Sequence, residues 1–211
     1  QDRINLDNKI KFFKTHSANW KAYNTSFTNL ENTLAVIHIV RDPRNIITSV
    51  LNHFSKENYL EALEFMNNST QRIWDDRNEN KKFLTLISTW SNHYNSWKKF
   101  EKNNLLISYE KLLNEPEKEF TKICNLLNKV ANLYFEKNQV YKAIDKCNFS
   151  NLQKLEAESG FVEAISDKEG NVKKFFNLGP NNNWKNLLDP KIKLQIENLF
   201  EKEMKEIGYI N

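Results

Sequence analysis

The stretch that decides the fold is Val36-Ile37-His38-Ile39-Val40-Arg41-Asp42-Pro43-Arg44-Asn45-Ile46-Ile47-Thr48-Ser49. The apolar run 34–40 is too short to span a membrane and too evenly apolar for a half-exposed strand, so it predicts a strand buried on both faces, as in a parallel sheet. Asp42 can cap the helix that follows, and Pro43 suits the first turn of that helix. The stretch therefore predicts a buried strand that runs directly into a helix.

A phosphate-binding site is predicted where this helix begins. The N-terminus of a helix offers free backbone N–H groups and the positive end of the helix dipole. Arg41 and Arg44 flank that end and can add charge-assisted hydrogen bonds. Ser49 follows Arg41 by eight residues, which places its hydroxyl about two turns into the helix. The alternative is that both arginines are ordinary surface charges at the start of a helix.

Strands and helices alternate along the rest of the chain. Residues 10–14 and 105–108 read as two further strands, and the Gly-, Pro- and Asn-containing segment 159–183 reads as a long loop, which is often functional at such a length. Apolar residues recur at helical spacing in three places, namely Phe83, Ile87, Trp90, Tyr94 and Trp97; Phe120, Ile123, Cys124 and Leu127; and Ile192, Ile196, Leu199, Phe200 and Ile207 after a predicted Asp189 cap and Pro190. The pattern predicts one α/β domain over residues 1–211, with a parallel sheet flanked by helices.

The predicted strands also indicate which edge of the sheet would bind a ligand. Ligands of open parallel sheets bind beyond the carboxyl ends of the strands. The residues that directly follow the three predicted strands are Lys14-Thr15-His16, Arg41-Asp42-Pro43-Arg44 and Tyr109-Glu110. We therefore expect a lysine, a histidine, two arginines and a tyrosine to converge on one cleft suited to an anionic ligand.

Composition limits the other classes of function. The chain has 211 residues with 31 Lys and Arg against 27 Asp and Glu, and the charges are interleaved, so a nucleic-acid footprint is not indicated. Cys124 and Cys147 make neither a disulfide framework nor a metal site. Neither a signal peptide nor a membrane-spanning stretch is recognisable, so the default expectation is a cytoplasmic protein.

Two of these segments resemble sulfotransferases that use 3′-phosphoadenosine-5′-phosphosulfate as sulfuryl donor. Arg41-Asp42-Pro43-Arg44 with Ser49 is similar to the family segment that grips the 3′-phosphate, and Phe13-Lys14-Thr15-His16 is similar to its Lys-Thr-His segment. The resemblance implies that His16 is the general base for the acceptor hydroxyl and that Lys14 stabilises charge on the transferring group, as this chemistry requires. The alternative is a solvated histidine beside a lysine at a strand end.

Later segments resemble the same family in the same order. Tyr109 is similar to a tyrosine that contacts the nucleotide base, although it could equally anchor a helix start. Phe149 stands where the family has a Ser-Phe pair near the adenine, although it could be a core residue. Residues 90–97, with His93 among tryptophans, resemble a family helix that we interpret as mainly structural. The resemblance therefore extends over most of the chain.

The last matching segment, residues 175–186, departs from the family at two points, with Asn177-Leu178 in place of Arg-Lys and Asn182-Asn183 in place of Gly-Asp. Gly179 and Trp184-Lys185-Asn186 match the late motif Arg-Lys-Gly-x-x-Gly-Asp-Trp-Lys-Asn, and Gly179 is implied to approach the nucleotide. Asn177-Leu178 replaces the Arg-Lys that would clamp the 3′-phosphate, which removes a charge-assisted hydrogen bond. We expect that grip to be weaker, or to be supplied by backbone N–H groups near Gly179 or by a lysine, for which the candidates are Lys173, Lys174 and Lys185.

The resemblance implies a function and a departure from the family fold. We expect a P-loop-NTPase-like sulfotransferase fold that lacks its first strand and phosphosulfate loop, because no segment matches Pro-Lys-Ser-Gly-Thr-Thr-Trp. This is consistent with a chain truncated at its N-terminus. Without that loop, we expect the chain to fail to position the donor. The implied reaction moves a sulfuryl group to the hydroxyl or amine of a small-molecule or glycan acceptor, without a metal. One alternative is a non-catalytic module that binds 3′-phosphoadenosine nucleotides. Another is a small-molecule kinase, which the absence of a Gly-Lys-Ser/Thr loop weakens. Neither the acceptor nor the oligomeric state is predicted.

Overall fold

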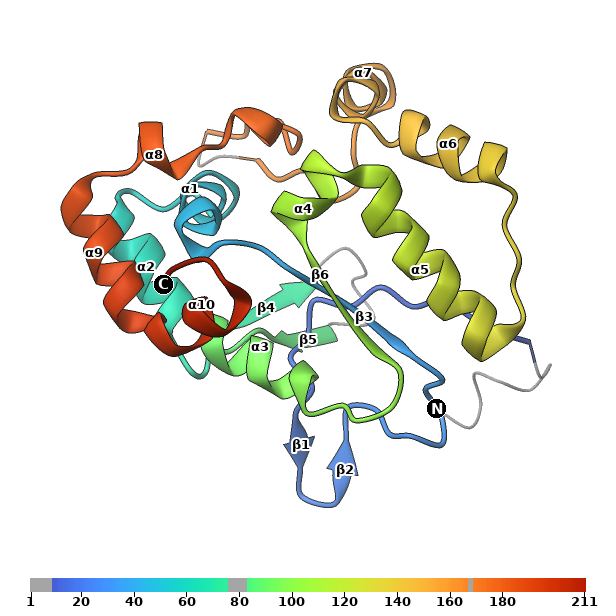
Figure 1. Ribbon diagram of the computed structural model, residues 1–211. Helices are drawn as coiled ribbons and strands as arrows, with labels where there is room; N and C mark the ends of the chain where they lie inside the picture. The colour runs from blue at the N-terminus through green and yellow to red at the C-terminus, as the bar shows by residue number, and fades with distance from the viewer. Residues whose placement is uncertain (1–8, 76–82, 167–168) are drawn as a thin grey trace.

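The computed structural model describes residues 9–75, 83–166 and 169–211. Its described strands form a parallel pair, β3 (Val36–Val40) with β6 (Asn104–Ser108), and two antiparallel pairs, β1 (Lys21–Ala22) with β2 (Thr25–Ser26) and β4 (Arg72–Asp75) with β5 (Phe83–Leu86). The helices are α1 (Pro43–His53), α2 (Tyr59–Asn67), α3 (Trp90–Lys98), α4 (Tyr109–Asn114), α5 (Pro116–Ala131), α6 (Lys137–Lys146), α7 (Phe149–Ser159), α8 (Trp184–Leu187), α9 (Pro190–Leu199) and α10 (Glu201–Ile207). The class is α/β, with a parallel strand pair flanked by helices (Figure 1).

The parallel pair brings two helix starts to one edge. The register pairs Val40 with Ser108, so the residues that follow the two strands are neighbours. Asp42 caps α1 by accepting from the backbone N–H of Arg44, and Ser108 caps α4 in the same way. Figure 1 shows α1 and α4 leaving the same end of the β3–β6 pair. The predicted strand–helix junction at Asp42-Pro43 is confirmed.

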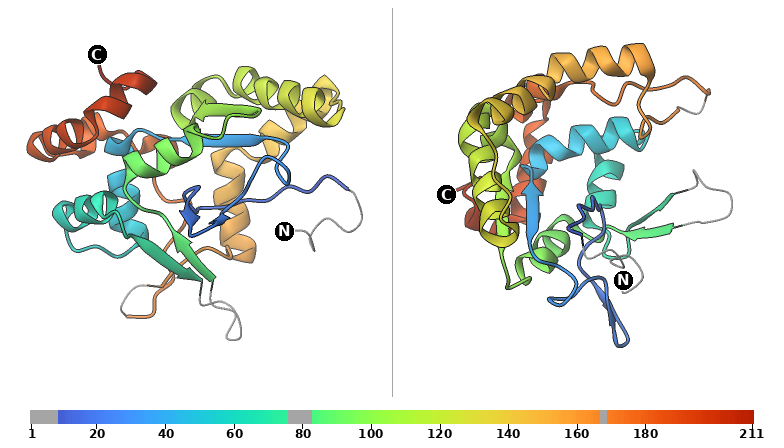
Figure 2. Two further views of the ribbon diagram at one scale, coloured as in Figure 1. Left: turned by 90° about the horizontal axis from the view of Figure 1, so that it is seen from below. Right: turned by 90° about the vertical axis from the view of Figure 1, so that its right-hand side faces the viewer.

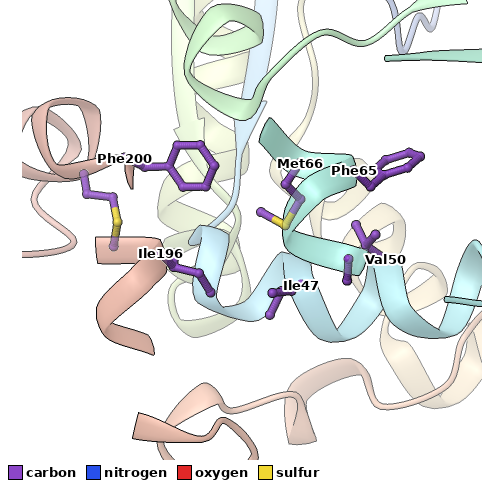
Figure 3. Close-up of a cluster of buried hydrophobic side chains, with 8 residues drawn as sticks. Ile47, Val50, Phe65, Met66, Ile196 and Phe200 are labelled. Carbon is purple, nitrogen blue, oxygen red and sulfur yellow. The ribbon is translucent and has the colours of Figure 1, made fainter. Parts of the chain in front are cut away.

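A hydrophobic core fixes one face of α1. Helices α2 and α9 both contact α1, and α9 also contacts α10. Figure 3 shows the side chains that meet there, and burying each large one contributes about 1.5–3 kcal/mol relative to leaving it in water. The buried members are Ile47, Val50, Ala62, Phe65, Met66, Ile196, Phe200 and Met204. The other face of α1 is thereby held toward the long loop that returns from α7 to α8.

The remaining helices form a second group. Helix α5 contacts β6 and α4, α6 contacts α5, and α7 contacts α6. Figure 2 shows α5, α6 and α7 following one another along one side of the molecule, and after α7 the chain returns to α1, which Asn182 contacts. Among its described residues, this return segment holds one 3₁₀ turn, Gly179–Asn181, and one isolated bridge, Ser166 with Val172. The predicted long loop is confirmed.

Four details of the predicted elements are wrong, the first being that the helical face predicted from Ile192 to Ile207 is divided at Phe200 into α9 and α10. Residues 10–14 are irregular rather than a strand, and Phe12 and Phe13 are 67% and 71% exposed, because this short lysine-flanked run has no backbone ladder to join in the described chain. Ile39 is 54% exposed, so β3 is not buried on both faces; its one strand partner among the described residues is β6. The apolar face predicted over 83–97 is split, because Thr89 caps α3 and residues 83–86 form β5.

Candidate active site

The guanidinium of Arg41 lies at the edge where β3 and β6 end. Its Nη1 atom lies 3.3 Å from Oγ of Ser49, to which it donates. The guanidinium carbon lies 4.5 Å from the centre of the Tyr109 ring, in cation–π contact. Its Nε atom is buried and has no hydrogen-bond partner among the residues that the structure describes. A fixed guanidinium with an unused buried donor is suited to an anionic ligand.

Arg41 lines a cavity of about 340 Å³. Two segments meet the start of α1 there, one being α4 and the other the end of the long loop. The lining residues are Arg41 and Asn45; Tyr109, Glu110, Leu113 and Asn114; and Gly179, Pro180, Asn182, Asn183, Trp184 and Lys185. The cavity therefore contains the predicted site residues Arg41, Tyr109 and Gly179, and Ser49 reaches it through its bond with Arg41.

The helix N-terminus itself does not provide the predicted phosphate cradle. Pro43 has no N–H group, and the N–H of Arg44 donates to the Asp42 side chain at 2.9 Å. The N–H groups of Asn45 and Ile46 both donate to the Asp42 carbonyl oxygen. Because the predicted cap uses these donors, the prediction of free backbone N–H groups at this terminus was wrong.

Arg44 is a structural residue rather than a ligand-binding one. Its side chain is buried and forms ion pairs with Asp42 at 2.6 Å and with Glu197 of α9 at 2.5 Å. It also donates to the carbonyl oxygen of Tyr209 and lies over the Trp184 ring. The pKa of Arg44 is raised: burial alone would lower it, but the bonds to Asp42 and Glu197 outweigh burial. The predicted pair of phosphate-binding arginines is therefore reduced to Arg41.

Two polar side chains to which the sequence analysis gave no role organise this edge. Glu110 accepts from the backbone N–H of Asp42 at 3.0 Å and from the hydroxyl of Tyr209 at 3.0 Å. Asn182 is buried and accepts from the Thr48 hydroxyl at 2.7 Å, while its amide donates to the carbonyl of Asn45. Glu110 thus joins α4 to α1, and Asn182 joins the late loop to α1. Only their positions beside Tyr109 and Gly179 in the sequence could have indicated them.

Gly179 and Phe149 are packed against one another. A Cβ atom on Gly179 would lie 2.3 Å from the Phe149 ring, and Gly179 has a φ of +52°, so any side chain there meets both a clash and backbone strain. Phe149 opens α7 directly after its Asn148 cap. The structure therefore places Phe149 against Gly179 and next to Phe176, and Phe149 does not itself line the Arg41 cavity.

The three lysines that could replace the missing Arg-Lys clamp differ in position. Lys185 lines the cavity with Arg41. Lys173 is used elsewhere, because its Nζ atom donates to the carbonyl of Asn52 and the hydroxyl of Ser55 at the far end of α1. Lys174 does not line the cavity. Lys185 is thus the best-placed substitute.

Lys14 and His16 form a second cluster, with Glu163 of the long loop. The Lys14 Nζ atom lies 2.6 Å from Oε1 of Glu163, and the His16 Nε2 atom lies 3.8 Å from Oε2 of the same carboxylate. The two predicted catalytic side chains are therefore together. They do not line the Arg41 cavity, so the predicted convergence of all three strand ends on one cleft is only partly correct.

Helix α3 holds the backbone of this cluster. The indole N–H of Trp97 donates to the carbonyl of Ser17 at 2.9 Å, and the Ser96 hydroxyl accepts from the N–H of Asn19 at 2.9 Å. His93 Nε2 lies 3.3 Å from the carbonyl oxygen of His16. The interpretation of this helix as mainly structural agrees with these contacts.

The histidines of the chain differ in electrostatic setting. Burial, with a smaller contribution from His93, lowers the pKa of His38 to about 4. Burial also lowers the pKa of His93 and of His53, and for His53 the Glu163 carboxylate opposes that shift. His16 differs from them in that its side chain is 57% exposed. Of the four, His16 is the most accessible to a substrate.

Two structural tests bear on other classes of protein. Within the ranges 9–75, 83–166 and 169–211, no three His, Cys, Asp or Glu side chains are grouped so that they could hold a metal ion. In the same described part of the chain, none of the helices has both the length and the apolar character needed to cross a bilayer.

Comparison with known proteins identifies relatives. Residues 1–208 match the model of the sulfotransferase domain family. Human Sulfotransferase 2A1 is 26% identical over 180 residues, which cover 82% of this chain and 57% of that protein. The chain thus spans less than two thirds of that relative's length.

Solved structures are similar in fold. Mouse sulfotransferase SULT7A1 complexed with PAP has a TM-score of 0.57 at 21% identity, covering 83% of this chain and 60% of that one. A retinol dehydratase in complex with androsterone and the inactive cofactor PAP has a TM-score of 0.53 at 17% identity, covering 81% and 47%. The fold is therefore the P-loop-like α/β fold of these enzymes.

Proposed function

Because the chain belongs to the sulfotransferase domain family, we propose that the protein transfers a sulfuryl group from 3′-phosphoadenosine-5′-phosphosulfate to a hydroxyl or amine of an acceptor. The observation that carries this proposal is the arrangement of Arg41, which bonds Ser49, stacks on Tyr109 and keeps a buried donor without a partner in the described chain. Arg41 and Ser49 are the residues to which the family resemblance assigns the 3′-phosphate.

The cavity suits the nucleotide part of the donor. Arg41 and Ser49 would bind the 3′-phosphate, and Lys185, which lines the same cavity, would add a second positive charge. Tyr109 would contact the adenine, and Phe149 would support the cavity wall by packing against Gly179. A cavity of about 340 Å³ lies in the size range of small-molecule and cofactor sites.

The chemistry belongs to the second cluster. His16 would take the proton of the acceptor hydroxyl or amine as the new bond from acceptor oxygen or nitrogen to sulfur forms. The bond from sulfur to the bridging phosphate oxygen would break, and its electron pair would leave on 3′-phosphoadenosine 5′-phosphate (PAP). Lys14 would stabilise the negative charge that grows on the transferring and leaving groups. The donor would supply the sulfuryl group, and the described residues would orient it and receive the proton.

A small molecule is the acceptor class best supported. The retinol dehydratase relative is in complex with androsterone, and the cluster around His16 is open enough for such a ligand to approach, since the His16 side chain is 57% exposed. A glycan acceptor would need the same hydroxyl chemistry and remains within the proposal.

One observation favours a second function, a non-catalytic nucleotide-binding module. Asn177-Leu178 stands in place of the family's Arg-Lys clamp, and Lys185 offers one charge where the family has two. Such a module would bind PAP and the donor, 3′-phosphoadenosine-5′-phosphosulfate, with similar affinity. It would not convert the bound donor into PAP.

One experiment separates the two functions. The complete protein product of the gene is incubated with ³⁵S-labelled donor and a panel of phenols, steroids, alcohols and sugars, and His16→Ala is compared with His53→Ala. Transfer that is lost with His16→Ala by about 10²–10⁴-fold, with PAP binding retained, supports the enzyme. Binding of the donor with no transfer to any acceptor supports the module and contradicts the enzyme.

A further inference from the structure

The long loop carries a carboxylate that contacts both residues of the proposed catalytic pair. Glu163 meets Nζ of Lys14 at 2.6 Å with one oxygen and approaches Nε2 of His16 at 3.8 Å with the other. We propose that Glu163 is a positioning residue for the reaction, holding the Lys14 ammonium and the His16 imidazole in register. This inference rests on the proposed function, in which those two side chains act on sulfur and on the acceptor proton.

The carboxylate is presented by an ordered part of the loop. Phe161, two residues before Glu163, packs against Phe175 and Phe176 with ring centres 4.6 and 5.1 Å away. The N–H groups of Phe175 and Phe176 donate to the Glu156 carboxylate of α7 at 2.6 and 3.0 Å. These contacts tie the loop to α7.

The loop is also tied to α1. The Lys173 N–H donates to the carbonyl of Ile165 at 2.8 Å. The ammonium of the same lysine donates to the Asn52 carbonyl at the end of α1 at 3.3 Å. With anchors on α7 and α1, Glu163 is held near a fixed position, which is what a positioning group requires.

The His16 segment is held independently from its other side. Helix α3 binds the backbone from His16 to Asn19 through His93, Ser96 and Trp97. The backbone contacts fix where His16 stands. Glu163 supplies a contact to the ring itself, so the two sets of contacts are complementary.

Charge gives the contact a role during the reaction. When His16 takes the acceptor proton it becomes an imidazolium, and a carboxylate 3.8 Å away stabilises that cation. The Glu163 side chain is only 25% exposed, so solvent screens this interaction less than it would at the open surface. Glu163 would thus favour the proton-transfer step and would contribute little to nucleotide binding.

The test uses the complete protein and steady-state kinetics with labelled donor. Glu163→Gln keeps the size of the side chain and removes its charge, Glu163→Asp keeps the charge, and Glu158→Gln is the control on an exposed glutamate of α7 that faces Lys154. We expect Glu163→Gln to lower kcat about tenfold, the low end of the cost of losing a hydrogen bond to a charged group. The KM for the donor and the Kd for PAP should stay at the wild-type values, and Glu163→Asp should recover part of kcat.

A double mutant locates the effect. Because Glu163 acts partly through His16, Glu163→Gln should lower kcat by a smaller factor in the His16→Ala background than in the wild type, and the factor that remains is the part that acts through Lys14. A Glu163→Gln kcat equal to or above that of Glu158→Gln, or a loss that appears in the KM for the donor, overturns the inference. If His16→Ala itself leaves kcat unchanged, the assigned base of the proposed function fails, which is a separate result.

Discussion

The Nε2 atom of His93 lies 3.3 Å from the carbonyl oxygen of His16. A carbonyl can only accept, so this hydrogen bond requires the His93 tautomer with the proton on Nε2. Burial lowers the pKa of His93, although its bond to the His16 backbone opposes the shift, so the ring is neutral at neutral pH. A structural histidine thus helps to hold the segment that carries the proposed base.

His93 is therefore expected to matter less than His16. His93→Ala should lower kcat for sulfuryl transfer by several-fold, because one hydrogen bond of about 0.5–1.5 kcal/mol is lost, whereas His16→Ala should cost about 10²–10⁴-fold. His93→Gln keeps an N–H donor and should recover part of the loss. If His93→Ala were as damaging as His16→Ala while circular dichroism stayed native, the wrong histidine would have been assigned as base.

Acid should destabilise the fold through His38. Its pKa is lowered to about 4 by burial, so the unfolded chain, with an ordinary value of 6.5, binds the proton more readily. Stability should therefore be complete above about pH 6.5 and decline as the pH falls toward 4, by up to roughly 3 kcal/mol. Urea unfolding at several pH values measures the decline.

The matching variant is His38→Leu, which cannot be protonated. Its unfolding free energy should fall less between pH 6.5 and pH 4 than that of the wild type, with the remaining slope due in part to His93, whose pKa is also lowered. Parallel curves for the two proteins would show that His38 is not a source of the acid sensitivity.

Arg44 is predicted to serve stability. Arg44→Met would leave the Asp42 and Glu197 carboxylates without their buried partner, and breaking a buried ion pair from one side costs about 3–5 kcal/mol. Chemical denaturation should show this loss, and Arg72→Met, at an exposed residue of β4, should show almost none. A stable Arg44→Met protein that had lost PAP binding would contradict this assignment and would indicate that Arg44 binds the phosphate.

Lys185 is predicted to assist the nucleotide by charge. Lys185→Met should weaken PAP binding by about 1 kcal/mol at low salt and by less at high salt, since an exposed cation is screened. Lys173→Met is the control, because that lysine bonds the end of α1 away from the cavity. Calorimetry in which Lys173→Met had the larger effect on PAP would reverse the assignment.

The local order of the fold was predictable from sequence where strong signals coincide. The apolar run before Asp42-Pro43 predicted β3 and α1 close to their observed bounds, and the cap at Asp189-Pro190 predicted where α9 begins. The segment 83–97 was misread because Phe83, Ile87 and Trp90 fall at helical spacing by coincidence, while the Thr89 cap starts the helix later. Residues 10–14 were misread because strand formation depends on a partner strand that local composition does not encode.

The grouping of the candidate residues was partly predictable from the sequence, and their roles in a site stay predictions. Arg41 with Ser49 and Lys14 with His16 are each found together. The role of Arg44 was not predictable, because its partners Glu197 and Tyr209 come from the other end of the chain. The role of Glu163 was not predictable either, since its position beside Lys14 depends on how the long loop folds.

The central claim is that Arg41 binds the 3′-phosphate of the donor nucleotide. Isothermal titration calorimetry of wild type, Arg41→Met and the Arg72→Met control with PAP and with adenosine 5′-phosphate tests it most directly. We predict that Arg41→Met weakens PAP binding by about 1.5–3 kcal/mol and leaves adenosine 5′-phosphate binding nearly unchanged. The Arg72→Met control should bind PAP as the wild type does. Equal losses for the two nucleotides, or no loss for PAP, would contradict the account.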